Sequence, residues 1–338
     1  LTGSASWWIS NIYTLPVVLI GGLLLIRKLR KGEMVWTFLI TSILFAIFYG
    51  YSIKGYIISY PLLFFAFVML TEPLTSPTSR MGKIIYGFLV GILFNQKGIS
   101  PEIALIIGNI FAYLISSKTK LILVLKQKNQ LARNIFEFVF EPNKKLNFVP
   151  GQYLEWTIPD QKSDSRGNRR YMTIASSPTE SDIRMATKYY EEPSSFKKTL
   201  ITLNTPIVAS QLAGDFVLPK DPSIKLVFVA GGIGITPYRS MIKYLIDTKQ
   251  TRDINLIYIN KTANEAVYKD VLDYVKTIYI NTSVTGHLDA DTIVKNIFDY
   301  QSRAWYISGP HNMVTATEEL LKSMGIKNLK TDFFPGLV

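Results

Sequence analysis

The chain has 338 residues, of which 48% are hydrophobic and 18% charged, and its formal net charge is +12. That length predicts two or three domains. The chain contains no cysteine, which excludes disulfides, thiolate-held iron–sulfur clusters and a thiol nucleophile within it.

The positive charge is concentrated in the most apolar third of the chain. Residues 1–120 carry ten Lys and Arg against three Glu, a net of +7. A nucleic-acid-binding protein would gather its basic residues on a polar domain, so we predict no nucleic-acid partner. Both histidines, His287 and His311, lie far downstream. The apolar third therefore lacks axial ligands for haem, and we predict no metal site.

Five apolar runs in this third predict membrane-spanning helices. A span takes about 20 mostly apolar residues, and fewer where flanking residues extend the helix. The runs cover residues 7–26, 34–51, 56–70, 84–94 and 103–115, of which the last two are short. The alternative is a large buried helical core in a soluble protein.

Basic residues alternate between the connections of these runs, which predicts their orientation. One set of connections carries Arg27, Lys28, Arg30, Lys31, Arg80, Lys83, Lys118 and Lys120, and the other set carries Lys54 and Lys97. By the positive-inside bias, the first set is cytoplasmic. We therefore expect a multi-pass protein of the cell membrane, in contact with membrane lipid, whose amino end faces outward and whose remaining chain lies in the cytoplasm.

Two stretches of the apolar third resemble a known membrane family. "GGLLLIRKLRKG" (residues 21–32) and "FVMLTEPLTSPTSRMGKIIYGFLVGIL" (67–93) are similar to the membrane family shared by the Rnf electron-transport complex and the sodium-pumping NADH:quinone reductase. The resemblance covers residues 3–117 and only the second half of the family's membrane domain. Glu72 stands where the family usually has Asp, although a simple turn would use the same residue types.

The family's covalent flavin mononucleotide is attached to a threonine in a Ser/Asp-Gly-Ala-Thr motif, which this chain lacks. "LTGSAS" (residues 1–6) has the same small residue types in another order. The resemblance therefore implies that any acceptor threonine lies upstream of Leu1 rather than at Thr2.

After Lys120 the sequence pattern changes to that of strands. "LILVLKQKNQLARNIFEFVFEP" (121–142) has β-rich stretches around polar turns, and "FVPGQYLEWTIP" (148–159) alternates with period two, so closely spaced strands predict a small antiparallel β-barrel. From residue 225, strands at 225–230, 254–260 and 303–309 alternate with helical patterns from 237, around 265–276 and at 315–324. That alternation predicts a parallel sheet with crossover helices. The boundary falls near residues 218–224.

A glycine turn opens the predicted parallel sheet. In "VFVAGGIGITPYRSM" (227–241), a strand is followed by Gly231, Gly232, Gly234, Thr236 and then Pro237 in the first helical turn. Such a turn lets backbone amides approach a diphosphate, and the helix amino end adds positive potential. A tight strand-to-helix turn without a ligand would use the same glycines.

The stretch "GNRRYMTIASSPTE" (167–180) gives this turn a context. Together with Pro150, Gln152 and Tyr153 upstream and the glycine turn downstream, it resembles the ferredoxin–NADP reductase superfamily over residues 121–338. The resemblance implies that Arg170 holds the diphosphate of FAD and that Thr173 bonds near flavin N5. Met172 takes the place of the family's ring-packing aromatic, beside Tyr171, and a thioether can still pack on a ring.

Three further segments extend this resemblance. "EPSSFKKTL" (192–200) implies a diphosphate turn at Ser194, Ser195 and Phe196, and "YISGPHNM" (306–313) implies a nicotinamide contact. In the second segment, Ser308 replaces the cysteine of the family's Cys-Gly-Pro, and Gly309 and Pro310 follow it. At the carboxyl end, Phe333 and Phe334 either stack over the flavin or pack in the barrel.

These features predict a membrane-bound flavoprotein oxidoreductase that takes hydride from NAD(P)H onto FAD and passes electrons to an acceptor in its membrane domain, a flavin or a quinone. Residues 1–118 would form the transmembrane domain, 119–222 the FAD-binding barrel and 223–338 the NAD(P)-binding α/β domain. Thr173 and Ser308 are the candidate catalytic residues. Redox-partner subunits are further expected partners.

Two alternatives stay open at the level of sequence. One is an ion-translocating redox-pump subunit, for which Glu72 is the acidic candidate near a span. The other is a reductase tethered by its helices that serves a soluble acceptor. NADH and NADPH are both compatible with Lys261 and Lys269 near the expected ribose end.

Overall fold

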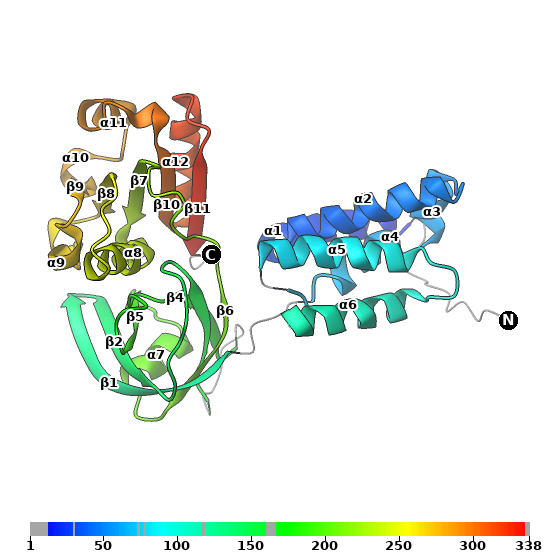
Figure 1. Cartoon of the computed structure of the whole chain (residues 1–338), viewed down its shortest axis with the longest axis horizontal. Helices are drawn as coiled ribbons and strands as arrows, with labels where there is room; N and C mark the ends of the chain where they lie inside the picture. Colours follow the sequence, from blue (N-terminus) through cyan, green and yellow to red (C-terminus); the bar gives the residue numbers. More distant parts are fainter. Residues whose placement is uncertain are drawn as a thin grey trace. The chain divides into compact units, whose positions relative to one another are not determined.

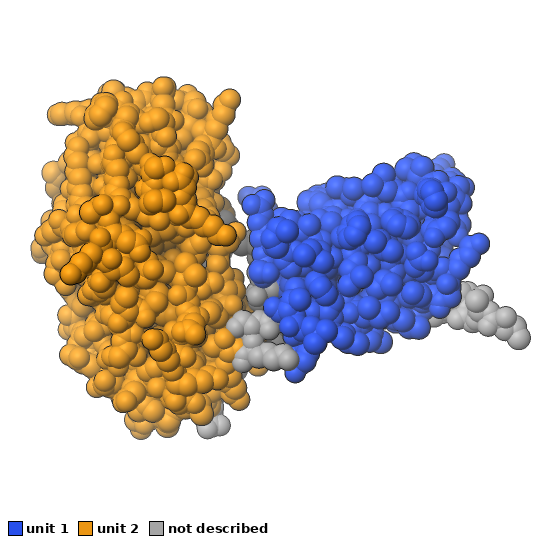
Figure 2. All heavy atoms as spheres, in the orientation of Figure 1, with its two compact units in different colours: residues 1–117 blue, residues 118–338 orange. Residues whose placement is uncertain are grey.

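The computed structural model describes residues 13–29, 31–72, 75–77, 79–115, 119–159 and 167–334, without the side chains of residues 28, 29, 58, 59, 333 and 334. The chain divides into two compact units, residues 1–117 and 118–338 (Figure 2).

The first unit is helical (Figure 1). Its elements are α1 (Leu15–Leu29), α2 (Gly32–Phe48), α3 (Ile53–Ser59), α4 (Leu62–Phe64), the π-helical segment η1 (Phe65–Met69), α5 (Arg80–Phe94) and α6 (Pro101–Ile115). Within the described ranges, none of these helices has both the length and the apolarity that crossing a membrane requires. The multi-pass topology is therefore not confirmed, although each predicted run contains helix.

The third predicted run is not one helix, and a proline explains why. Tyr60 is extended, with φ −97° and ψ 147°, and it separates α3 from α4. Because Pro61 lacks an N–H and disfavours helical geometry in the residue before it, the helix ends there and restarts as a short α-helical and π-helical segment. The expectation of a continuous span over residues 56–70 was wrong in this respect.

Helices α2 and α5 pack backbone to backbone. A Cβ at Gly87 would meet the carbonyl oxygen of Met34 and lie 3.1 Å from the amide nitrogen of Phe38. Aromatic rings fill the adjoining interior, with Phe65 4.9 Å from Phe94 and 5.3 Å from Phe38 between ring centroids. Glycine at position 87 therefore sets the close approach of the two helices.

The second unit begins with a six-stranded antiparallel sheet. Its strands are β1 (Lys120–Ala132), β2 (Ile135–Pro142), β3 (Tyr153–Thr157), β4 (Arg169–Thr173), β5 (Ile183–Lys188) and β6 (Ile207–Ala213), in the order β4-β3-β6-β1-β2-β5, with helix α7 (Ser195–Ile201) between β5 and β6. The period-two pattern of β3 directs Leu154 and Trp156 into the barrel core. The antiparallel sheet predicted as a small β-barrel is thus present as a half-barrel.

A five-stranded parallel sheet follows, in the order β11-β10-β7-β8-β9. Its strands are β7 (Leu226–Gly231), β8 (Ile254–Asn260), β9 (Lys276–Asn281), β10 (Ala304–Pro310) and β11 (Leu329–Phe334). Alternate residues of β7 serve the two faces: Phe228 packs under α8 (Thr236–Asp247), and Val229 packs under α11 (Ala290–Asn296) and α12 (His311–Ser323). The predicted parallel sheet covered by helices is confirmed.

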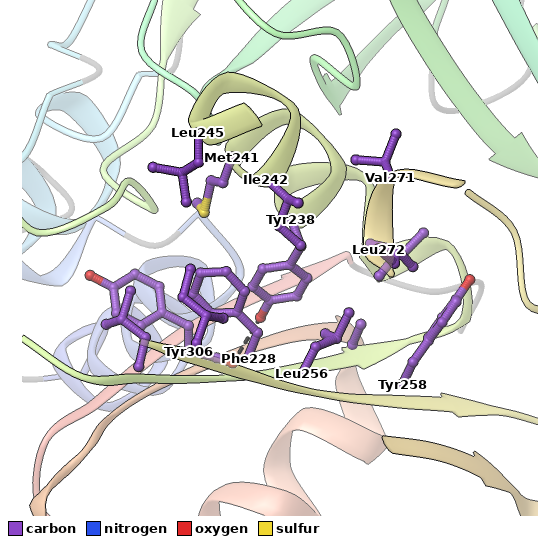
Figure 3. Packing of buried hydrophobic residues seen from close by; sticks show 14 of the residues in the cluster. Phe228, Tyr238, Met241, Ile242, Leu245, Leu256, Tyr258, Val271, Leu272 and Tyr306 are labelled. Atoms are coloured by element: carbon purple, nitrogen blue, oxygen red, sulfur yellow. Dashed lines mark hydrogen bonds between the residues drawn. The ribbon is translucent and has the colours of Figure 1, made fainter. Parts of the chain in front are cut away.

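Aromatic and aliphatic side chains together fill the core between the sheet and α8 (Figure 3). Tyr238 on α8 stacks on Phe228 at 4.5 Å between ring centroids. Its hydroxyl is buried and donates to the carbonyl oxygens of Tyr306 (2.8 Å) and Val229 (3.1 Å). Helix α8 is thereby fixed over the two strands, β7 and β10, whose carboxyl ends carry the candidate nucleotide residues.

One helix predicted for this sheet was wrong. In place of a helix around residues 265–276, the chain forms the 3₁₀ turn η3 (Ala263–Glu265) and the single turn α9 (Lys269–Leu272). Tyr268 between them has φ +62°, a conformation that interrupts a right-handed helix, and Lys276 already begins β9. The smaller elements are α10 (Thr282–Thr285) and the 3₁₀ turns η2 (Gly232–Ile235) and η4 (Tyr300–Ser302).

Candidate functional site

Strand β4 places the central candidates of the barrel beside β3. The antiparallel register pairs Tyr153 with Thr173 and Leu154 with Met172. The indole nitrogen of Trp156 donates to the carbonyl oxygen of Met172 at 3.1 Å, which fixes β4 from within the barrel core. Thr173 itself is buried.

Arg170 reaches a segment that lies far away in the sequence. Its guanidinium lies 5.5 Å from the ring centroid of Phe196 and donates to the carbonyl oxygens of Gly167 (2.9 Å) and Arg169 (2.7 Å). Phe196 lies in α7, which Ser194 caps by accepting a hydrogen bond from the Lys197 amide at 3.4 Å. The structure thus brings Arg170 to Phe196, the residue that follows Ser194 and Ser195 at the start of α7.

Tyr171 and Met172 point to opposite sides of β4. Met172 packs against the barrel core, whereas Tyr171 is half exposed and meets Tyr153 edge to face at 5.7 Å between centroids. The Tyr171 hydroxyl donates to Glu155 at 2.8 Å. Burial, and to a smaller extent this hydrogen bond, raises the pKa of the hydroxyl above its ordinary value. The aromatic ring that shares a face with Thr173 is therefore Tyr171.

The turn before β3 supports the end of β4. Gly151 has φ +96°, and a Cβ there would meet the carbonyl oxygen of Phe216. The side-chain oxygen of Gln152 accepts from the Val149 amide at 2.8 Å, and the backbone carbonyl oxygen of Gln152 accepts from the amide of Ile174 at 3.0 Å. A backbone hydrogen bond thus joins the Pro150–Gln152 turn, which was predicted as part of the flavin site, to the residue that follows Thr173.

The glycine turn lies at the carboxyl end of β7, beside β10. Gly232 has φ +51°, and a Cβ there would enter open space, whereas a Cβ at Gly234 would lie 2.6 Å from the carbonyl carbon of Ser308. Thr236 then begins α8, with Pro237 in its first turn, as predicted. Gly231, Gly232, Gly234, Thr236 and Ser308 therefore meet at one edge of the sheet.

The side-chain hydroxyl of Ser308 is notable within this group. It is fully buried at the end of β10, and in the described part of the structure its hydroxyl has no hydrogen-bond partner. A buried hydroxyl without a partner is costly. Together with the open space at Gly232, it fits a site that a polar nucleotide completes.

The carboxyl-terminal aromatics lie next to this edge through their backbone. Strand β11 pairs with β10 so that Phe333 is opposite Gly309 and Phe334 opposite Pro310. Their side chains lie outside the described part of the chain, so stacking and barrel packing both stay predictions.

Comparisons with known proteins agree with this architecture. Residues 1–122 match the NQR2, RnfD, RnfE family, and residues 228–319 match the oxidoreductase NAD-binding domain. Flavohemoprotein A of Dictyostelium discoideum is 24% identical over 62% of this chain and 59% of its own length, and the flavohemoprotein of Oceanobacillus iheyensis is 26% identical over 59% and 55%. The chain thus spans less than two thirds of these relatives.

Solved structures show the same fold in the second unit. The ferredoxin-NADP⁺ reductase of Plasmodium falciparum superposes with a TM-score of 0.54 at 21% identity, covering 65% of this chain and 99% of its own. The flavohem-like FAD/NAD binding domain of the nitric oxide dioxygenase of Vibrio cholerae superposes with a TM-score of 0.54 at 15% identity and the same coverage. Both resemblances predicted from the sequence are confirmed.

Fold, site and family matches together define a class. The second unit has the two-domain fold of the ferredoxin-NADP⁺ reductase structure, and its residues 228–319 match the oxidoreductase NAD-binding domain. The first unit carries the match to the NQR2, RnfD, RnfE family.

Proposed function

We propose that this protein is a membrane-bound oxidoreductase that takes hydride from NAD(P)H onto FAD and passes electrons to an acceptor associated with its first unit, a flavin or a quinone. The observation that carries the proposal is the meeting of the glycine turn with the buried Ser308 hydroxyl at the end of β10, which has no hydrogen-bond partner among the described residues. When bound, FAD supplies a hydride acceptor that can release electrons one at a time.

The chain's own residues would bind and orient the two cofactors. Arg170, with Ser194, Ser195 and the ring of Phe196 beside it, would hold the FAD diphosphate through charge-assisted hydrogen bonds. Thr173 would orient the reacting edge of the flavin, with Pro150, Gln152 and Tyr153 supporting its strand and Tyr171 rather than Met172 contacting the ring.

On the nucleotide side, the turn from Gly231 to Thr236 and the amino end of α8 would bind the nicotinamide nucleotide's diphosphate. Pro237, in the first turn of that helix, has a φ angle fixed near the helical value. Ser308 would donate its hydrogen bond at the nicotinamide, where Gly309 and Pro310 let the strand end beside the turn.

The exterior of the first unit supports a membrane location. Exposed apolar residues follow one face of α6 at helical spacing, while Ala104, Gly108 and Ala112 face inward. The outward residues are Ile103, Ile106, Ile107, Ile110, Tyr113 and Leu114. A soluble monomer rarely exposes such a surface. Helix α6 has 15 residues, or about 22 Å, so the bilayer would have to thin around it.

A reconstitution experiment tests the function and separates its alternatives. The intact protein should release FAD on denaturation, and anaerobic NADH or NADPH should bleach that flavin. In liposomes, reduction of a quinone analogue supports the proposed acceptor, and a membrane potential that accompanies it supports an ion pump. Reduction of a soluble acceptor alone supports a tethered reductase, and absence of bound flavin contradicts all three.

Removing the Arg170 guanidinium is expected to weaken FAD binding. Arg170→Ala loses a charge-assisted contact worth about 1.5–3 kcal/mol, which raises the FAD dissociation constant about ten- to a hundredfold. Flavin titration of the apoprotein measures it. Arg133→Ala, an exposed arginine of the barrel, is the control. Unchanged FAD affinity in Arg170→Ala would refute the assignment.

Accessibility of introduced cysteines is expected to report the topology. The native chain has no cysteine, and Lys54, Lys97, Arg27 and Lys220 are all exposed. By the positive-inside bias, an impermeant thiol reagent on intact cells should label Lys54→Cys and Lys97→Cys but neither of the others. Permeabilised cells should show all four labelled.

Two labelling results would contradict this topology. Labelling of Lys220→Cys from outside would invert it and separate the reductase unit from cytoplasmic NAD(P)H. Protection of Lys97→Cys alone would show that α5 and α6 do not cross the membrane.

A further inference from the structure

Helix α8 is attached directly to the chain that continues from strand β4. Arg239 donates to the carbonyl oxygen of Ala175 at 3.0 Å, and the Ser240 hydroxyl donates to that of Ser176 at 2.6 Å. Ala175 comes two residues after Thr173 of the flavin strand, and Arg239 comes three residues after the end of the nucleotide turn. The contact therefore joins the two candidate cofactor sites by a short path.

A buried ion pair reinforces the attachment. The Arg239 guanidinium binds both carboxylate oxygens of Glu180, with Nη2 at 2.9 Å from Oε1 and Nη1 on Oε2. Arg239 is buried, and Glu180 follows β4 on the same chain segment as Ala175. Although burial alone would raise it, the Arg239 guanidinium holds the pKa of the Glu180 carboxyl below its ordinary value. A bidentate pair of this kind fixes orientation as well as distance.

The ion pair is part of a larger network between the barrel and the nucleotide domain. Arg184 on β5 lies 3.2 Å from Glu180 and 3.0 Å from Glu137 on β2. The hydroxyl of Tyr268, from the nucleotide domain, donates to Glu137 at 3.0 Å, and its ring lies 5.7 Å from the Arg239 guanidinium. Each domain thus contributes polar groups whose hydrogen-bond partners lie in the other domain.

We propose that Arg239 is a positioning residue for hydride transfer: through Glu180 and Ala175 it sets the placement of the nicotinamide turn relative to strand β4. This role rests on the proposed function. Hydride transfer requires the reacting atoms in near-contact, and a displacement of about 1 Å can cost on the order of a hundredfold in rate. A rigid attachment between the two binding segments would prevent such displacements.

Other contacts would hold the domains together when Arg239 is lost. Lys188 on β5 pairs with Glu265 at 2.9 Å, and Ile135 and Phe216 belong to the apolar core under α8. Removal of Arg239 should therefore loosen the placement of the domains rather than separate them.

The first test measures the distance between the domains in the full-length protein. Spin labels on Gln127→Cys in β1 and Glu319→Cys in α12, both exposed, report that distance. We expect a narrow distance distribution in the parent and a broader one in Arg239→Met. Arg303→Met is the matched control, because Arg303 is equally buried and pairs with Asp253 (2.7 Å) inside the nucleotide domain.

The second test measures flavin reduction by NAD(P)H in anaerobic stopped flow. In Arg239→Met the limiting rate should fall about tenfold or more, while the half-saturating NAD(P)H concentration changes less than about threefold. Arg239→Lys, which keeps the charge, should recover part of the rate. Arg303→Met should retain the parent's rate.

The outcomes separate positioning from simple stabilisation. A narrow distribution in Arg239→Met, or a broad one with an unchanged limiting rate, overturns the proposal. If Arg239→Met does not fold, Glu180→Gln and Ser240→Ala undergo the same two measurements and decide it by the same criteria. If NAD(P)H fails to reduce the parent flavin, the proposed function fails, and the label distances still report whether Arg239 fixes the domains.

Discussion

Gly234→Val is expected to abolish nicotinamide-nucleotide binding and to destabilise the nucleotide domain by about 3 kcal/mol or more. A Cβ at this position would lie 2.6 Å from the carbonyl carbon of Ser308 and 2.7 Å from the Cα of Gly309. Both atoms belong to the backbone of β10, so no side chain can rotate to relieve the overlap. The turn and the strand end must move apart, which separates the amides of the turn from Ser308.

Gly232→Ala is the control for the stability part of this prediction. Gly232 has φ +51°, but a Cβ there meets nothing within 4 Å, so the expected cost is the left-handed conformation alone, about 1–2 kcal/mol. Denaturant unfolding gives the two stabilities, and titration with NADH and NADPH gives the two affinities. Parent-like nucleotide binding in Gly234→Val would show that the turn does not carry the site.

Three strands of the nucleotide domain could be predicted because their sequence pattern is dominated by local apolar runs, whereas β9 and β11 were not predicted. Residues 225–230, 254–260 and 303–309 correspond to β7, β8 and β10. The predicted helix at 265–276 failed because Tyr268 has a positive φ and because β9, which pairs with β8, already begins at Lys276. Propensity alone does not reveal that pairing.

The break in the third apolar run had a visible signal. Pro61 lies inside residues 56–70, and a proline disfavours helical geometry in the residue before it. The apolar pattern continues across this residue, but the run divides into α3, α4 and η1.

The candidate site was predictable only where its residues lie within one motif. The glycine turn and strand β4 could each be recognised locally. The contact of Arg170 with Phe196 and the ion pair of Arg239 with Glu180 join separate motifs, and the second pair is 59 residues apart. Arg170 was predicted as a diphosphate ligand, and Arg239 lies just after the glycine turn, but no periodicity in a single sequence indicates which distant ring or carboxylate each of them meets.

Trp156→Ala is expected to destabilise the barrel by about 3–5 kcal/mol and to remove FAD binding with it. Trp156 is fully buried, and its ring lies 5.6 Å from that of Phe140 between centroids. Its loss would leave a cavity beneath β4 and would also remove the 3.1 Å hydrogen bond to the carbonyl oxygen of Met172. Strand β4 carries both Arg170 and Thr173, so the flavin contacts should loosen together.

Trp156→Phe distinguishes the packing from the hydrogen bond. Phenylalanine keeps most of the apolar volume but cannot donate to Met172, so the expected loss is about 1–2 kcal/mol, with FAD still bound. Denaturant unfolding of the full-length protein and the flavin content after purification measure both effects. If Trp156→Ala kept the parent's flavin content, the placement of Arg170 and Thr173 would not depend on the core beneath β4. Equal losses in the two variants would instead assign the effect to what both lack, which is the hydrogen bond and the part of the indole ring that phenylalanine does not replace.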